Sequence, residues 1–225
     1  MKVISSVPKL LEKAPSRVEV YNDLDRELVN FFAVLRDSKL FARLRESVEH
    51  TPYARAEFEL AKQKSDDPVE AARRFIVRSR QSFAGKGGEW SYSVKGSHGG
   101  MASSVQRWSQ GIASLPAVHD RFRDVQIECD DWYAVMSRYD SPETLYFLDP
   151  PYIPDTRVSG KYRHELTQND HHEIVARLLG FRRMIVLCGY EHKTYKPLEQ
   201  AGWRGLTTGL ESMPVPLPVV NSWEA

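Results

Sequence analysis

The sequence has little cysteine and no long apolar run. Only Cys129 and Cys188 occur among 225 residues, which excludes a disulfide framework and disfavours a zinc site. Both lie in apolar, strand-like runs, so we expect buried thiols in a reducing compartment. No stretch approaches the roughly 20 apolar residues that span a bilayer, and the N-terminal residues hold no continuous apolar segment typical of a secretory signal. We therefore expect a cytoplasmic protein without a membrane partner.

An overall charge excess is also absent, since the formal net charge is +1. The charge is nevertheless unevenly distributed along the chain. Residues 51–110 hold 10 Lys and Arg against 6 Asp and Glu, whereas residues 111–140 hold 3 against 6. A basic excess confined to one segment indicates either a solvated helical face or a surface for an anionic partner, and both alternatives remain open.

Glycine is absent before Gly85 and abundant directly afterwards. Residues 84–104 hold six glycines and five serines, which predicts a loop or a hairpin with flexible ends. Trp90, Tyr92 and Val94 alternate within this segment and favour one short β element. The aromatic rings of Trp90 and Tyr92 either form a hairpin core or contact a ligand.

Strand-like and helical segments alternate along the rest of the chain. Short apolar runs predict strands over residues 17–23, 124–132, 144–152 and 183–190. Apolar spacing close to 3.6 predicts helices over residues 24–47, within 51–82, over 105–122 and over 167–181. Asp66 or Asp67 before Pro68, and Thr167 or Asn169, are candidate helix caps. This alternation predicts an α/β fold with a mostly parallel sheet.

Acidic residues follow three of the predicted strands. They are Asp23 and Asp25, Asp130 and Asp131, and Asp149. In open parallel sheets the ligand crevice lies beyond the carboxyl ends of the strands, where carboxylates can bind hydroxyl and amine groups. The alternative is that each acid only caps the helix after it. Their recurrence at three strand ends favours a ligand site.

The last of these acids begins the motif Asp149-Pro150-Pro151-Tyr152. The two prolines hold the backbone extended and supply no N–H, while their carbonyls remain acceptors. The acid adds an anionic acceptor and the tyrosine adds a flat face for stacking. Together they suit an amine on a planar ring, such as the exocyclic amine of a nucleobase. Core packing is the alternative for the tyrosine.

This motif resembles the Asp-Pro-Pro-Tyr motif of N6-adenine-specific DNA methyltransferases, most closely in the Dam-like D12 class. Five blocks in the family's order extend the resemblance over residues 17–204. They are RVEVYNDLDRELVNFFAVLRD, RRFIVRSRQSFAG, VQIECDDW, LDPPYIPDTR with KYRHELTQNDHHEI, and VLCGYEHKTYKPLEQAGW. The resemblance implies a Rossmann-like, mostly parallel sheet with a helical and loop target-recognition insertion. It divides the chain into a partial cofactor-binding region (1–50), a target-recognition insertion (51–120) and a catalytic region (121–225).

The implied activity is methyl transfer from S-adenosylmethionine to N6 of an adenine flipped out of double-stranded DNA. The catalytic residues implied are Asp149, Pro150, Pro151 and Tyr152. The cofactor contacts implied are Asp23, Asp131 and Trp132, and the DNA contacts implied are Arg80, Lys86 and Lys95. No metal is required, and for His171 and His172 we favour a helix surface or a packed imidazole over a metal site. The implied source is a bacterium or a phage.

The chain departs from the family at its N-terminus. There the family has a strand and a glycine-rich loop that holds the methionine moiety of the cofactor, but the 16 residues before Arg17 contain no glycine. We therefore expect an incomplete sheet with a gap beside the strand that ends near Asp23. We also expect weak cofactor binding. A catalytically silent DNA-binding or interaction relative is thus the alternative to an active methyltransferase.

Overall fold

In the computed structural model the chain forms two compact units, one of Met1–Asp25 with Glu128–Ala225 and one of Arg26–Ile127. The structure describes residues 2–4, 14–85, 87–94, 97–98, 100–156, 164–205 and 217–221. The protein is a mixed α/β protein with short strands, most of them paired in parallel, so the predicted α/β class is confirmed at this level. No helix among the described residues is long and apolar enough to cross a membrane.

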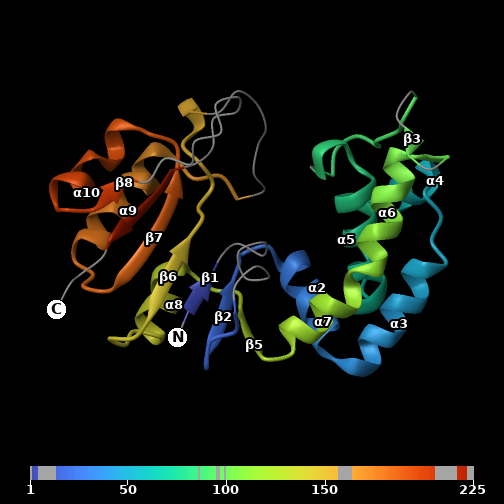
Figure 1. Cartoon of the computed structure of the whole chain (residues 1–225), viewed down its shortest axis with the longest axis horizontal. Helices are drawn as coiled ribbons and strands as arrows, with labels where there is room; N and C mark the ends of the chain where they lie inside the picture. Colours follow the sequence, from blue (N-terminus) through green and yellow to red (C-terminus); the bar gives the residue numbers. More distant parts are fainter. Residues whose placement is uncertain are drawn as a thin grey trace. The chain divides into compact units, whose positions relative to one another are not determined.

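Seven strands of the described chain form the main sheet, in the order β5-β2-β1-β6-β7-β9-β8. They are β1 (Lys2–Ile4), β2 (Glu19–Asn22), β5 (Val125–Glu128), β6 (Leu145–Leu148), β7 (Met184–Gly189), β8 (Arg204–Gly205) and β9 (Leu217–Asn221). Strand β1 pairs in parallel with β2 and β6, and β6 pairs in parallel with β7. Strands β7 and β8 both pair with β9 in the antiparallel sense. Figure 1 shows β2, β1, β6 and β7 side by side.

The predicted gap beside β2 is wrong, because β1 fills it. Val3 lies opposite Val20 of β2 on one side and Tyr146 of β6 on the other. Main-chain pairing with a neighbour on each side holds this central strand of three residues. The glycine loop that follows this strand in the family would fall on residues 5–13, which lie outside the described residues.

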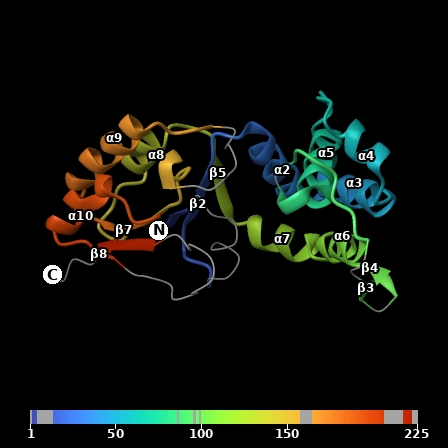
Figure 2. The ribbon, with the colours of Figure 1, turned by 90° about the horizontal axis from the view of Figure 1, so that it is seen from above.

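Helices α8 (Trp132–Arg138), α9 (Gln168–Leu179) and α10 (Lys196–Gln200) lie together on one face of this sheet (Figure 2). Buried side chains of the strands and helices form one apolar cluster: Val20, Tyr146, Ile185, Leu187, Val135, Met136, Ile174, Val175, Leu178 and Leu198. Thr167 caps α9 in a reciprocal capping box with Asp170, so this predicted cap is confirmed. This cluster packs β2, β6 and β7 against the three helices, and it holds the residues just after β6 and β7 in place.

The unit Arg26–Ile127 is mainly helical. Its helices are α2 (Arg26–Arg36), α3 (Ser38–Glu49), α4 (Arg55–Leu60), α5 (Pro68–Gln81), α6 (Ser103–Ala113) and α7 (Leu115–Phe122). The short hairpin of β3 (Ser97–His98) and β4 (Met101–Ala102) directly precedes α6 (Figure 2). Phe32 and Phe122 stack with ring centroids 4.2 Å apart in its core. Asp67 caps α5 ahead of Pro68, as predicted.

The single helix predicted over residues 24–47 is wrong, because α2 and α3 divide at Asp37. The Asp37 carboxylate accepts hydrogen bonds from the backbone N–H groups of Lys39 and Leu40, each at 2.9 Å. These bonds satisfy amide donors at the start of α3, so a new helix begins although the apolar spacing continues across the break.

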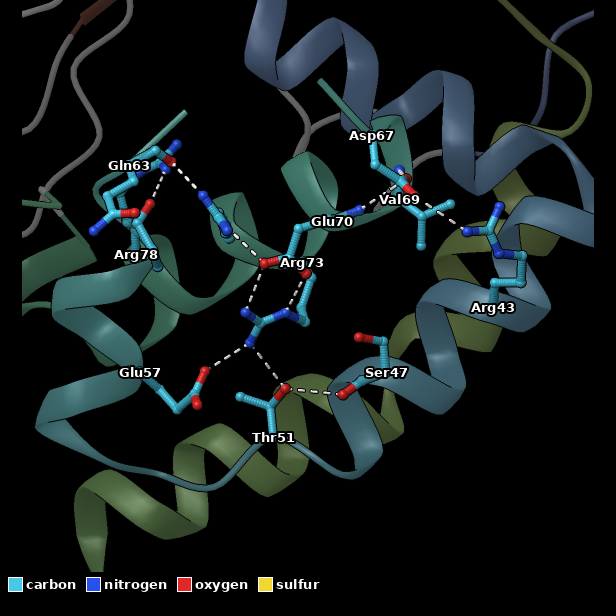
Figure 3. A network of polar contacts seen from close by, with 12 residues as sticks. Arg43, Ser47, Thr51, Glu57, Gln63, Asp67, Val69, Glu70, Arg73 and Arg78 are labelled. Atoms are coloured by element: carbon cyan, nitrogen blue, oxygen red, sulfur yellow. Dashed lines mark hydrogen bonds and ion pairs between the residues drawn. The ribbon is translucent and has the colours of Figure 1, made fainter. Parts of the chain in front are cut away.

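A polar network centred on Arg73 connects three segments of this unit (Figure 3). Arg73 is only 7% exposed, and its guanidinium donates to Glu70 at 2.7 and 2.8 Å and to Glu57 at 2.8 Å. It also donates to the Thr51 hydroxyl at 3.2 Å, and that hydroxyl donates to the Ser47 carbonyl at 2.8 Å. The network ties α4 and the segment after α3 to α5.

Two predictions about smaller features are corrected by the structure. Cys129 is exposed and Cys188 is half-buried, so the prediction that both thiols are buried is wrong. Strand β5 ends at Glu128, one residue before Cys129, which therefore leaves the sheet. The alternating segment around Trp90 contributes one isolated bridge to Ser82 rather than a strand of its own.

Candidate active site

Carboxylates from the ends of β2 and β6 gather around the buried hydroxyl of Tyr21. That hydroxyl donates to Asp23 at 3.2 Å, and the backbone N–H of Asp25 donates to the other Asp23 oxygen at 2.8 Å. Burial raises the pKa of Tyr21, and the negative charges of Asp23, Asp149 and Asp25 raise it further. Only β1 separates β2 from β6 in the sheet. The structure therefore brings the acids of two predicted strand ends together around one neutral phenol.

Asp149 and Tyr152 lie against each other directly after β6. The Tyr152 hydroxyl donates to Asp149 Oδ1 at 3.2 Å, and both side chains are half-buried. Burial raises the pKa of the Asp149 carboxyl, while the hydrogen bond from Tyr152 partly opposes this rise. The Tyr152 ring meets the Tyr190 ring edge-to-face, with centroids 5.1 Å apart. The result is a poorly solvated anionic acceptor beside two aromatic rings.

The Asp149–Tyr152 motif is anchored at both of its ends. Strand β6 holds it on one side through parallel pairing with β1 and β7. On the other side Ile153 is 2% exposed and belongs to the apolar cluster under the sheet. The Ile153 carbonyl accepts from the backbone N–H and the hydroxyl of Thr156, at 3.0 and 2.8 Å. With the fixed backbone angles of the two prolines, these contacts restrict the motif to one path.

Asn22 connects the end of β2 to the residues after β5. Its amide nitrogen donates to the Asp130 carbonyl at 3.0 Å, and its amide oxygen accepts from the Asp130 N–H at 3.1 Å. The Asp130 carboxylate pairs with Arg138 at 2.9 Å. The two-point contact fixes the neighbouring Asp23 and Asp131 relative to each other, although 108 positions separate the bonded residues.

Asp131 and Trp132 begin helix α8. The Asp131 carboxylate caps this helix by accepting from two backbone N–H groups, those of Tyr133 and Ala134, at 3.0 and 3.1 Å. Trp132 is half-buried and packs against the apolar cluster. Helix capping and core packing thus account for these contacts, and a role in cofactor binding remains a prediction for both residues.

Of the three predicted DNA contacts, Arg80 is the one within the described residues. It is exposed near the end of α5, and its side chain passes close to Gly111 of α6. A Cβ atom added at Gly111 would lie 3.3 Å from the Arg80 Nε. Lys86 and Lys95 lie outside the described residues. The following segment exposes large apolar side chains, those of Phe83, Tyr92 and Val94. Nearby, the Arg55 guanidinium lies 4.7 Å from the centroid of the half-buried Trp90 ring.

Three residues of this site, Tyr21, Asn22 and Tyr190, were not predicted from the sequence. Tyr21 and Asn22 directly precede Asp23, and Tyr190 directly follows β7, so attention to every residue at a strand end would have found them. Of the two alternatives given for the histidines, the structure shows a packed, fully buried imidazole for His171 and an exposed ring for His172. Among the described residues, no three His, Cys, Asp or Glu side chains are grouped as a metal site.

The fold and site define an α/β protein that gathers carboxylates and tyrosines at the ends of parallel strands, with an Asp-Pro-Pro-Tyr motif among them. Residues 10–185 match the sequence profile of the D12 class N6 adenine-specific DNA methyltransferase. The chain belongs to this family. A search of curated proteins found no match. Membership of the family implies adenine methylation in DNA, and the matched range includes Asp23 and Asp149.

Proposed function

We propose that this protein transfers a methyl group from S-adenosylmethionine to N6 of an adenine that is flipped out of double-stranded DNA, within a Rossmann-like unit. One observation carries the proposal. The half-buried Asp149, whose pKa burial raises, accepts a hydrogen bond from Tyr152 at the end of β6. A carboxylate in this environment binds an amine favourably, because the amine supplies hydrogen-bond donors that replace the water lost on burial.

In the proposed reaction, Asp149 and the Pro150 carbonyl accept hydrogen bonds from the N6 amine of adenine. Neither proline offers an N–H, so this part of the backbone presents acceptors only. Accepting both amine protons directs the nitrogen lone pair out of the ring plane. As the nitrogen gains the methyl group, the Asp149 carboxylate would stabilise the positive charge that develops on it, and one of the two N6 protons must then leave to give the neutral product. Tyr152 stacks on the flipped base and holds the reacting atoms in place.

S-Adenosylmethionine supplies an activated methyl group when bound, and the residues after β2 fit its ribose. Each Asp23 oxygen accepts one hydrogen bond within the protein, from Tyr21 or from Asp25. A carboxylate has about four acceptor positions, so Asp23 retains capacity for ribose hydroxyls. We assign Asp131 and Trp132 to the adenine moiety of the cofactor. The segment that would hold the methionine moiety falls on residues 5–13, outside the described residues.

We assign DNA recognition to residues 51–120, and the cofactor and catalytic regions to residues 1–50 and 121–225. Arg80, Lys86 and Lys95 would contact phosphates, which position the duplex. The exposed rings of Phe83 and Tyr92 offer faces for base stacking, in keeping with the basic excess of this segment. The resulting partner is double-stranded DNA.

A catalytically silent, DNA-binding relative is the second candidate, and the absence of glycine before Gly85 favours it. We expect the chain alone to bind S-adenosylmethionine weakly, because glycines that let the backbone approach the cofactor closely are missing. Calorimetric titration measures this affinity, and Asp23→Ala is the control that should remove the remaining heat of binding. A dissociation constant in the low micromolar range for the unaltered chain would contradict this expectation.

The test of the proposed function is the formation of N6-methyladenine in unmethylated DNA at saturating cofactor, measured by mass spectrometry of the released nucleosides. We expect Tyr152→Ala to reduce the rate about 10- to 100-fold, since stacking of a base on an aromatic ring contributes about 1–3 kcal/mol. Tyr152→Phe keeps the ring and loses only the hydroxyl, so it should retain most of the activity.

Equal rates for the Ala and Phe variants of Tyr152 would rule out stacking on this ring. If the unaltered chain forms no N6-methyladenine even at saturating cofactor but still binds DNA, the catalytic proposal fails and the silent relative is favoured.

A further inference from the structure

His171 is a fully buried imidazole of α9 with one ring nitrogen left without a hydrogen bond. Its Nδ1 lies 3.0 Å from the Tyr195 hydroxyl. Its Nε2 is buried and has no partner within normal hydrogen-bond geometry. Buried polar atoms without a partner are rare in folded proteins, because leaving one unsatisfied costs about 1–3 kcal/mol. The unpaired Nε2 of this buried ring therefore needs a hydrogen-bonding partner.

The His171 ring lies close to the Asp149–Tyr152 motif, because its partner Tyr195 and Ile153, the residue after the motif, belong to one buried cluster. Burial lowers the pKa of His171, and the Pro151 carbonyl opposes that effect. The remaining charges around the ring are the carboxylate of Asp170, which favours the protonated form, and the imidazoles of His192 and His172, which disfavour it. The Pro151 carbonyl of the motif is therefore the acceptor that we assign to this ring.

The second partner, Tyr195, is fixed by close packing under β7. It is 5% exposed, and a Cβ on Gly189 would lie 3.1 Å from its ring and 3.3 Å from its hydroxyl oxygen. Glycine at position 189 is what lets the phenol approach the strand. Tyr190, the next residue, contacts the Tyr152 ring. Tyr195 and His171 therefore support the motif from the core, while Tyr190 contacts it directly.

The hydrogen-bond partners select one tautomer of His171. Burial raises the pKa of Tyr195 to about 12 and lowers that of His171, so both groups are neutral at pH 7. The neutral phenol can donate to Nδ1, which places the single ring proton on Nε2. The Nε2–H is then the donor for the Pro151 carbonyl. The opposite tautomer would turn a lone pair toward that carbonyl and repel it.

We propose that His171 is a positioning residue that holds the Pro151 carbonyl through its Nε2–H and thereby fixes the direction of the Pro150 carbonyl and the Asp149 carboxylate. The proposal rests on the methyl transfer proposed above. Catalytic hydrogen bonds are often long in the free enzyme and shorten when substrate binds. We expect the Nε2–H to close onto the Pro151 carbonyl in this way when a flipped base fills the site, and to orient the amine acceptors for the transfer step.

Kinetics of three variants test this role. His171→Met keeps an apolar side chain in the space but removes both ring nitrogens, and we expect kcat to fall about 10- to 100-fold. The KM for DNA should stay within about threefold, because the lost contact acts on the transfer step rather than on binding. His171→Gln places an amide N–H near the Nε2 position and should restore most of kcat. His172→Met, at the neighbouring exposed histidine, is the matched control and should be unchanged.

A kcat for His171→Met equal to that of the unaltered protein would overturn the proposal. Melting temperatures separate this outcome from unfolding: if both position-171 variants lose stability equally but only His171→Gln keeps activity, the positioning role is supported. If both are equally stable and equally inactive, the Nε2–H donor is not the operative group and the proposal fails.

The ring tautomer provides a readout that needs no methylation. In ¹⁵N spectra of histidine-labelled protein, we expect His171 as the Nε2–H tautomer, with a proton that exchanges slowly with solvent. Tyr195→Phe should weaken this preference by removing the donor to Nδ1. An Nδ1–H tautomer in the unaltered protein would overturn the proposal even if the protein methylates DNA. If the protein shows the expected tautomer but no methyl transfer, the proposed function fails while the contact to Pro151 is supported.

Discussion

Asp149→Asn is expected to reduce methyl transfer about 100- to 1,000-fold while making the folded protein more stable. The loss of activity follows from the role of the carboxylate opposite the amine nitrogen, since removing one preorganised electrostatic partner of a transition state costs about this factor. The amide oxygen of asparagine can still accept the hydrogen bond from Tyr152. The local geometry therefore remains, and the negative charge is the main feature lost.

The expected gain in stability follows from the sign of the pKa shift. Burial raises the pKa of Asp149 above its ordinary value of 3.8, so the folded state binds this proton more tightly than the unfolded state. The ionised carboxylate consequently costs stability above the folded pKa, and the cost disappears below 3.8, where both states are protonated. We expect Asp149→Asn to be more stable than the unaltered protein at pH 7, with no gain near pH 3.

Asp155→Asn is the matched control, because Asp155 is an exposed acid six residues further along the same loop. It should change neither the rate of N6-methyladenine formation nor the urea midpoint of unfolding. A clear loss of stability in Asp149→Asn at pH 7, or an activity equal to that of the control, would contradict the role assigned to Asp149.

The parts of the fold that were predicted correctly depend on local physics. The apolar runs of β6 and β7 and the caps at Asp67 and Thr167 each lie within a few residues of sequence, where spacing and capping chemistry are visible. Strand β1 was missed because Lys2–Ile4 is too short to show a period, and its place is fixed by pairing with β2 and β6. A central strand of three residues is determined mainly by its neighbours.

The candidate site likewise has features that the sequence predicts and features that depend on long-range contacts. The acceptor character of Asp149 and the prolines could be predicted because it belongs to the residues themselves. The Asn22 contact to Asp130 and the His171 contact to Tyr195 could not, since 108 and 24 positions separate the partners. For Asp131, capping was an open alternative in the sequence, and the structure shows the capping contacts. Sequence thus indicated the residue types at the site, whereas long-range packing decides which of them support one another.

Arg73→Met is expected to lower the free energy of unfolding by about 3 kcal/mol. The guanidinium is buried and satisfies two carboxylates, those of Glu57 and Glu70, as well as the Thr51 hydroxyl. Methionine fills part of the space but leaves two partly buried negative charges without this partner. Breaking a buried ion pair by removing one member typically costs this amount.

Arg45→Met is the matched control, since Arg45 donates to Glu49 at 2.7 Å, as Arg73 does to Glu70. Both members of the Arg45 pair are exposed, at 54% and 43%, so we expect a loss below about 1 kcal/mol. Urea denaturation followed by helical circular dichroism compares the two variants. Equal losses would show that burial adds nothing to the Arg73 network.

The pH dependence of stability in Arg73→Met separates the contribution of charge from that of packing. The guanidinium groups of Arg73 and Arg74 lower the pKa of Glu70 from 4.5 to about 2. A carboxyl with a lowered folded pKa contributes stability that is fully present above 4.5 and is lost as the pH falls toward about 2. Arg74 still donates to Glu70 in Arg73→Met, so only part of this dependence should remain. The stability curves of the unaltered protein and the variant should therefore converge across this window, whereas a constant difference would mean that the loss comes from packing alone.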